Sequence, residues 1–259
     1  MELGLNGRWA IVCASSKGLG KACAASLARE GSNVVMNGRN ETTLLATVDE
    51  VRRLGSGEVT PVVADINTED GRSALFAACP EPDILVNNNA GPPPGDFAAW
   101  GDGDFQSALD ANFLAPTFMI QRAIEGMKAR RFGRIVNITS AMVKSPHAAM
   151  GLSTAARSGL TALCKGLSNE AVAFNVTINN LLPERFDTDR QKFMANVLME
   201  RQGLTLEQAR EAITDTINAK RFGQPEEFGD ACAYLCSAQA GFISGQNLQL
   251  DGGSYAGLI

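Results

Sequence analysis

Short, almost continuously apolar runs recur along the whole chain, separated by longer segments with a different periodicity. The runs lie at Trp9–Cys13, Asn33–Asn37, Thr60–Ala64, Asp83–Asn87, Arg134–Ile138, Val176–Leu182 and Asn247–Leu250. Runs of this kind, which lack regular polar alternation, predict strands of a sheet that is covered on both faces.

The segments between these runs show helical spacing. Apolar residues recur every three or four positions at Leu44, Val48, Val51 and Leu54. Longer helices are predicted over residues 105–130, where Pro116 interrupts or kinks the helix, and over residues 153–174. Because strands and helices alternate from end to end, we expect one α/β domain over residues 1–259, with a Rossmann-type doubly wound parallel sheet of about seven strands.

One segment is out of step with this alternation. Residues 188–221 are polar and rich in helix-forming residues. In α/β enzymes such an insertion is typically a flap that faces the substrate. We therefore expect a substrate lid here, and an ordinary pair of surface helices is the alternative.

Composition and charge exclude several classes of protein. The 259 residues are 45% hydrophobic, and 23 basic against 28 acidic residues give a formal net charge of −5. This balance argues against nucleic acid as a partner, and without an apolar run of 18 residues no membrane span is expected.

Six cysteines with no C-x-x-C pair, and an N-terminus with no secretory pattern, predict a cytoplasmic protein without disulfides. The single histidine, His147, argues against a histidine-built metal site, so no metal is expected.

The first predicted strand leads directly into residues 13–20, C-A-S-S-K-G-L-G, and then into a helix. Backbone amides at a helix N-terminus attract phosphate, and glycines let a pyrophosphate approach the chain. The turn is therefore a candidate phosphate loop for a dinucleotide. A turn of small residues that packs helix against strand is the alternative.

In this and other motifs the chain resembles the short-chain dehydrogenases/reductases, over essentially its whole length. The phosphate loop is similar to the family's T-G-x-x-x-G-x-G. Further similarities, in the family's order, are Asp65-Ile66, Asn87-Asn88-Asn89-Ala90-Gly91, Asn112, Ser140, the pair Asn179 and Pro183 of N-x-x-x-P, Ser244-Gly245-Gln246 and Asp251-Gly252-Gly253.

The resemblance implies a nicotinamide dinucleotide cofactor and a homo-oligomer, either a tetramer or a dimer. It implies roles in catalysis for Ser140 and Asn112. The cofactor contacts that we expect are Ser15, Ser16, Lys17, Gly18, Leu19, Arg39, Asp65, Ile66, Asn88, Arg157, Pro183 and Thr188.

Charges near the end of the second strand favour the phosphorylated cofactor. An acid there would bind the ribose 2′-hydroxyl of NAD, but the strand ends in Asn37-Gly38-Arg39. Arg39 can pair bidentately with a 2′-phosphate, and Lys17 supplies a second cation. With no competing carboxylate expected, the sequence predicts NADP(H).

Two departures from the family pattern are modest. Ala14 replaces the first glycine of the phosphate loop, which predicts that this residue keeps a negative φ. Glu184 follows Pro183 where the family usually has glycine, and it adds a charge near the nicotinamide side.

The third departure concerns the family's Y-x-x-x-K pair, in which the tyrosine transfers a proton. Ser153 and Arg157 stand at the two positions. The chain has only two tyrosines, Tyr234 and Tyr255, and both lie far along the sequence. No residue therefore takes over the tyrosine's role from the resemblance.

Reduction of a carbonyl group needs a proton donor and positive charge near the developing alkoxide. Arg157 can supply charge but does not titrate near neutrality. Lys144, four residues after Ser140, can titrate, and burial beside Arg157 would help it to release its proton. Ser140 would then orient the substrate oxygen. His147 is a second candidate donor, and the third possibility is that neither residue serves.

The leading hypothesis is an NADP(H)-dependent oxidoreductase that interconverts a ketone or aldehyde and an alcohol. The resemblance implies 3-oxoacyl or similar oxo compounds as its substrates. A lyase or isomerase in which Lys144 abstracts a proton is one alternative. A catalytically silent NADP-binding protein is another.

Overall fold

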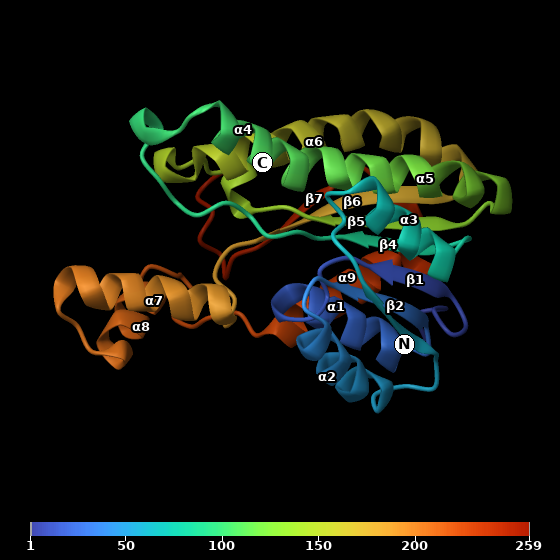
Figure 1. Ribbon diagram of the computed structural model, residues 1–259, viewed down its shortest axis with the longest axis horizontal. Coiled ribbons are helices and arrows are strands. Elements are labelled where there is room, and N and C mark those ends of the chain that lie inside the picture. Colours follow the sequence, from blue (N-terminus) through green and yellow to red (C-terminus); the bar gives the residue numbers. More distant parts are fainter. Residues whose placement is uncertain (1, 259) are drawn as a thin grey trace.

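A parallel sheet of seven strands, in the order β3-β2-β1-β4-β5-β6-β7, forms the centre of the computed structural model, which describes residues 2–258 (Figure 1). The strands are β1 (Trp9–Val12), β2 (Asn33–Gly38), β3 (Val59–Val63), β4 (Ile84–Asn87), β5 (Gly133–Ile138), β6 (Val176–Pro183) and β7 (Asn247–Leu250). Each predicted run is a strand, with small shifts at the ends. The predicted doubly wound α/β domain is thus confirmed.

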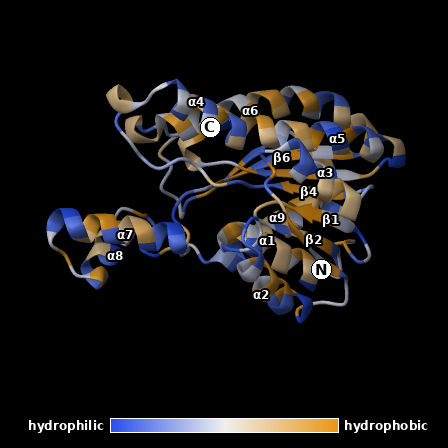
Figure 2. Ribbon diagram, in the orientation of Figure 1, coloured by the Kyte–Doolittle hydropathy of each residue, from blue (hydrophilic) through white to orange (hydrophobic). Residues whose placement is uncertain are grey.

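Helices cover both faces of the sheet. The helices of the chain are α1 (Gly18–Arg29), α2 (Glu41–Arg52), α3 (Glu69–Ala78), α4 (Asp102–Leu109), α5 (Ala115–Arg130), α6 (Gly151–Ala171), α7 (Asp189–Gln202), α8 (Leu206–Asp215) and α9 (Pro225–Cys236), of which α7 and α8 do not cover the sheet. Alternate strand residues enter different cores: Val12 packs with α1, α2 and α9, whereas Ile11 packs with α3, α5 and α6. Figure 2 shows hydrophobic residues concentrated on β1, β2 and β4. Within residues 2–258 no helix has the length and apolarity needed to cross a bilayer.

The helix predicted over residues 105–130 is divided in two. Helix α4 ends at Leu109, a π-helical turn follows at Asp110–Leu114, and α5 begins at Ala115. Pro116 is the second residue of α5, and the N–H of the residue before it, Ala115, donates to the carbonyl of Asp110, five residues back. The interruption therefore takes the form of a π turn just before the proline.

A row of asparagines crosses four strands at matching register positions. Asn87 Nδ2 donates to Asn137 Oδ1 at 2.9 Å, Asn137 Nδ2 to Asn180 Oδ1 at 2.9 Å, and Asn180 Nδ2 to Asn247 Oδ1 at 2.8 Å. Because buried amides need partners, these bonds favour one register for β4, β5, β6 and β7. They therefore hold the register of the four strands at the level where β4 and β5 end.

Residues 188–221 contain α7 and α8, which extend to one side of the sheet (Figure 1). Gly203, at φ +66°, ends α7, and Thr205 caps α8. The two helices share an apolar core of their own, which consists of Ala195, Ala209, Ile213, Ile217 and Phe222.

Candidate active site

The carboxyl ends of β1 and β4 form the switch point of the sheet. The two strands are neighbours. However, α1, which follows β1, packs on one face of the sheet, and α5, which follows β4 in the chain, packs on the other face. In open α/β sheets ligands bind in the crevice at such a point. Asn88, just after β4, donates from Nδ2 to the carbonyl of Ala14 at 3.1 Å and so joins the two loops.

Ala14 has φ +44°, so the predicted negative φ was wrong. Its N–H donates to Asn37 Oδ1 at 3.2 Å, and its carbonyl accepts from Asn88. The next residue, Ser15, donates its N–H to the Asn37 carbonyl at 2.7 Å. These bonds hold the turn in the left-handed region against a cost of about 1–2 kcal/mol for a residue with a Cβ.

Ser15 and Ser16 occupy different environments. The Ser15 hydroxyl is fully buried, donates to the Val12 carbonyl at 2.8 Å and accepts from the N–H of Asn37 at 2.9 Å. It therefore ties β1 to β2. Ser16 lies against the end of β2, where a Cβ at Gly38 would approach its Oγ to 3.0 Å.

The N-terminus of α1 has no side-chain cap among the described residues, and no acid lies in its first turn. Helices α2, α3 and α8 are capped by Asn40, Thr68 and Thr205. The first N–H groups of a helix lack helical partners and attract anions. Gly18, at φ +54°, opens α1, and Thr188 Cγ2 lies 3.8 Å from the position of a Cβ there. This cradle fits a phosphate group of the expected cofactor.

Arg39 and Lys17 are exposed beside this cradle. The expectation that no carboxylate competes for Arg39 was wrong, because Asp65 Oδ2 lies 3.9 Å from Arg39 Nη1. Asp65 follows β3, and the pairing of β3 with β2 brings the two together. The sequence could not show this neighbour, because the two residues belong to different loops.

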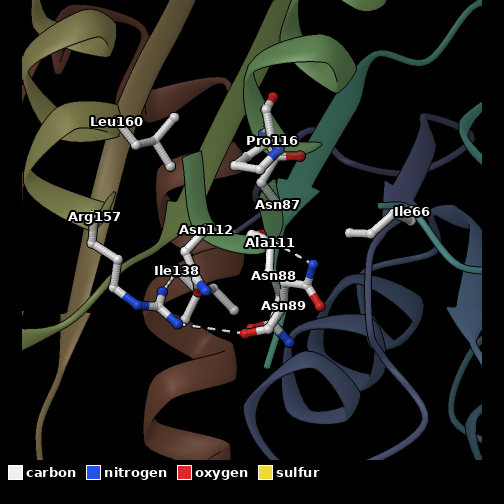
Figure 3. A pocket seen from close by; sticks show the side chains of 10 residues that line it. All are labelled: Ile66, Asn87, Asn88, Asn89, Ala111, Asn112, Pro116, Ile138, Arg157 and Leu160. Carbon is white, nitrogen blue, oxygen red and sulfur yellow. Dashed lines mark hydrogen bonds between the residues drawn. The ribbon is translucent and has the colours of Figure 1, made fainter. Parts of the chain in front are cut away.

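Arg157 links α6 to two strand ends, as Figure 3 shows. Its guanidinium donates to the carbonyls of Ile138 (2.7 Å), Thr139 (3.1 Å) and Asn89 (3.4 Å), and its Nε donates to Ser153 Oγ (3.2 Å). Burial lowers the pKa of Arg157 to about 10, and the nearby charge of Arg190 adds to the shift. Arg157 is therefore still protonated at neutral pH. Ser153 and Arg157, which stand at the family's tyrosine and lysine positions, are hydrogen-bonded to each other.

A cavity of about 10 Å³ lies beside Arg157. Asn112, in the π turn, donates to the carbonyls of Ala90 (3.3 Å) and Ala108 (3.4 Å). Within residues 2–258, Asn112 Oδ1 and Asn87 Oδ1 are buried acceptors that lack a donor, and both residues line the cavity, as does Ile66. The volume is close to that of one water, which would donate to both oxygens.

Ser140 and Lys144 belong to the loop after β5. Ser140 Oγ accepts from the N–H of Met142 at 3.2 Å and starts a short 3-10 turn, which Lys144 ends. Lys144 is half-buried, less than expected, and its Nζ lies 5.4 Å from the centre of the Tyr255 ring. His147 is exposed, and its Nδ1 accepts from the N–H of Ala149 at 3.3 Å.

Glu184 follows Pro183, the last residue of β6, and its side chain is 22% exposed. Its Oε1 lies 3.6 Å from Arg185 Nε. Burial raises the pKa of Glu184, Arg185 opposes this rise, and Asp251 adds to it. A carboxylate with a raised pKa thus lies at the carboxyl edge of β6.

Residues 13–255 match a family model described as enoyl-(acyl carrier protein) reductase. The chain belongs to the short-chain dehydrogenase/reductase family. This short-chain dehydrogenase/reductase is 32% identical over 250 residues to a 3-oxoacyl-(acyl-carrier-protein) reductase, FabG, of Rickettsia bellii, with 96% of this chain and 97% of the relative covered. It is 31% identical over 253 residues to the NADPH-dependent reductase BacG of Bacillus subtilis, with 95% and 97% covered.

Solved structures give the same family. The L-sorbose reductase of Gluconobacter frateurii, complexed with NADPH and L-sorbose, matches with a TM-score of 0.94 and 25% identity over all of both chains. In this short-chain dehydrogenase/reductase Tyr255, which reasoning from the sequence set aside because it lies far along the chain, has its ring centre 5.4 Å from Lys144 Nζ. Tyr255 lies four positions after Asp251, in a turn that leaves β7 at the carboxyl edge. Sequence separation places Tyr255 far from Lys144, whereas the position of this turn at the carboxyl edge of the sheet brings the two residues together.

Proposed function

We propose that this short-chain dehydrogenase/reductase is an NADP(H)-dependent oxidoreductase that interconverts a carbonyl compound and an alcohol. The observation that carries the proposal is the uncapped N-terminus of α1, flanked by the exposed cations Lys17 and Arg39. Relatives named as NADPH-dependent reductases support the same cofactor. A 3-oxoacyl compound or a similar oxo compound is the substrate class, in line with the relatives named FabG.

The residues that would hold the cofactor come from five loops. Backbone groups of Ser15, Ser16, Gly18 and Leu19 face the diphosphate, and Lys17 and Arg39 face the 2′-phosphate. The adenine side contacts Asp65 and Ile66, and the nicotinamide side contacts Asn88, Pro183 and Thr188. Arg157 has five N–H donors and uses four in the bonds described above, so one remains for a ribose hydroxyl.

When bound, NADPH supplies the hydride. Ser140 Oγ orients the substrate oxygen by a hydrogen bond. Lys144 gives a proton from Nζ to this oxygen, and its positive charge stabilises the negative charge that develops there. Arg157 and Asn112 keep the loop after β4 and the end of β5 in place.

Residues 188–221 form the substrate lid in this proposal. Thr188 lies beside Gly18, and Arg190 Nη2 lies 3.5 Å from the carbonyl of Pro92 in the loop after β4. The protein assembles as a dimer or tetramer through the partly exposed apolar residues of α4, α5 and α6. These include Phe105, Leu109 and Phe118.

The decisive experiment follows NADPH and NADH oxidation with a panel of oxo compounds that includes ethyl acetoacetate. We expect oxidation of NADPH in equal amount to the alcohol formed, and loss of turnover without loss of NADPH binding in Lys144→Met. We expect His147→Ala to retain turnover, and loss of turnover in that variant would identify His147 as the proton donor. Substrate conversion without NADPH consumption would indicate a lyase or isomerase. Saturable NADPH binding with no turnover on the whole panel would indicate a silent binding protein.

A further inference from the structure

We propose that Tyr255 is a positioning residue that holds the ammonium group of Lys144 at the substrate side of the sheet. The proposal rests on the role of Lys144 in the proposed function. It places a residue of the C-terminal segment beside the loop after β5. The C-terminal segment would then have a role in the reaction.

The turn after β7 fixes the backbone of Tyr255. Asp251 Oδ1 accepts from the N–H of Gly253 at 2.9 Å, and Oδ2 accepts from the N–H of Tyr255 at 2.8 Å. Gly252 and Gly253 have φ of +65° and +78°, which only glycine adopts readily. The sequence D-G-G therefore sends the chain back toward the loop after β5.

The Lys144 side chain ends over the face of this ring. The distance of 5.4 Å from Nζ to the ring centre lies within the range of a cation–π interaction. The backbone of Lys144 is held as well, because its N–H donates to the Ala141 carbonyl at 3.0 Å. A lysine has a flexible four-carbon stem, so a contact at the ammonium group selects among its rotamers.

The same turn is bonded to the end of residues 188–221, the segment that forms the lid in the proposed function. Asn218 Nδ2 donates to the Gly253 carbonyl at 2.6 Å, and the N–H of Ala219 donates to the Gly252 carbonyl at 3.0 Å. A Cβ at Gly252 would approach Ile217 Cγ2 to 2.9 Å. The position of Tyr255, and through it that of Lys144, therefore depends on where this segment lies.

Three variants test the role of the ring. Tyr255→Leu removes the ring, Tyr255→Phe keeps it without the hydroxyl, and Tyr234→Leu removes the partly exposed tyrosine of α9 as a control. With ethyl acetoacetate and NADPH we expect Tyr255→Leu to lower kcat about five- to tenfold at unchanged NADPH affinity and thermal midpoint. Tyr255→Phe and the control keep the kcat of the wild type within about twofold.

A second measurement needs no substrate. The rate at which acetic anhydride modifies Lys144, followed by peptide mass spectrometry, should rise in Tyr255→Leu and stay unchanged in Tyr255→Phe and Tyr234→Leu. An unchanged rate in Tyr255→Leu overturns the proposal. So does a Tyr255→Phe variant that loses as much turnover as Tyr255→Leu, because the hydroxyl would then be the active group. If Lys144→Met is inactive while Tyr255→Leu is fully active, only this inference fails. If Lys144→Met retains turnover, the proposed role of Lys144 fails.

Discussion

Asn137 on β5 donates a 2.9 Å hydrogen bond from its side chain to Oδ1 of Asn180 on β6, and both side chains are buried. Asn137 Oδ1 also accepts from Asn87 on β4. Asn137, one of the two inner members of the asparagine row, therefore has a neighbour on each side. Its removal leaves a donor on Asn87 and an acceptor on Asn180 away from water.

We expect Asn137→Ala to lower the free energy of unfolding by about 2–4 kcal/mol, because each unpaired buried group costs about 1–3 kcal/mol. Urea denaturation followed by circular dichroism measures the change. Asn247→Ala is the control: Asn247 is only half-buried, so water can reach the end of the row, and the loss there should be about 1 kcal/mol or less. Equal losses in the two variants would contradict this account.

The charge beside the phosphate cradle predicts a change in cofactor preference. Arg39→Gln should reduce the preference for NADPH over NADH about tenfold, because it removes a cation that can pair with the 2′-phosphate. Asp65→Asn should change the preference in the opposite direction, since it removes the carboxylate 3.9 Å from Arg39. Fluorescence titration with both cofactors gives the ratio. Arg53→Gln, an exposed charge at the end of α2, should leave it unchanged.

Glu184 predicts a dependence of stability on pH. Burial raises its pKa in the folded state above the ordinary value of 4.5, so the folded protein binds this proton more tightly than the unfolded chain does. The stabilising effect of the bound proton is complete below pH 4.5 and is lost as the pH rises through the folded pKa. Glu184→Gln should therefore be more stable than the wild type at pH 7, with a difference that shrinks toward pH 4.

Urea midpoints of Glu184→Gln and the wild type at pH 4, 5, 6 and 7 provide the measurement. Glu200→Gln, on the exposed side of α7, is the matched control and should give no such trend. A gain in stability of Glu184→Gln that is the same at every pH would show that packing, and not ionisation, causes it.

Ala14 predicts a stabilising substitution. Its φ of +44° disfavours a residue with a Cβ, so Ala14→Gly should relieve strain and raise the free energy of unfolding by about 0.5–1 kcal/mol. Ala14→Val should lower it, because a β-branched residue tolerates this φ least. Thermal unfolding of the two variants and the wild type gives the order. A less stable Ala14→Gly would show that the freedom of the unfolded chain outweighs the strain.

The sequence was sufficient to locate the seven strands, because most of them are buried, continuous apolar runs that end where polar or turn residues begin, but it did not predict their order in the sheet. It was less accurate for the helices. Helix α3 was not predicted, since Glu69, Asp70, Gly71 and Arg72 precede its apolar residues and hide the helical spacing. The break at Leu109 was placed at Pro116, although the chain widens into a π turn one turn earlier.

The site was predicted less completely, and the reason is spatial. Asp65 lies beside Arg39, and Tyr255 lies beside Lys144, because of strand order and not because of sequence spacing. Local preference also failed at Ala14, where a hydrogen bond donated to Asn37 and another accepted from Asn88 outweigh the usual φ of alanine. Contacts between loops that follow different strands can be predicted only when the strand order of the folded sheet is known.

The apolar core shared by α7 and α8, which is separate from the two cores of the sheet, has a consequence for redesign. Ile213, Ile217 and Phe222 pack with other residues of the same segment, so exchange of residues 189–222 for the equivalent stretch of a relative would keep Thr188 and leave both faces of the sheet filled. If this segment is the substrate lid of the proposed function, chemical selectivity and nucleotide affinity are separable traits, and a library of grafts at this single place would sample one while conserving the other.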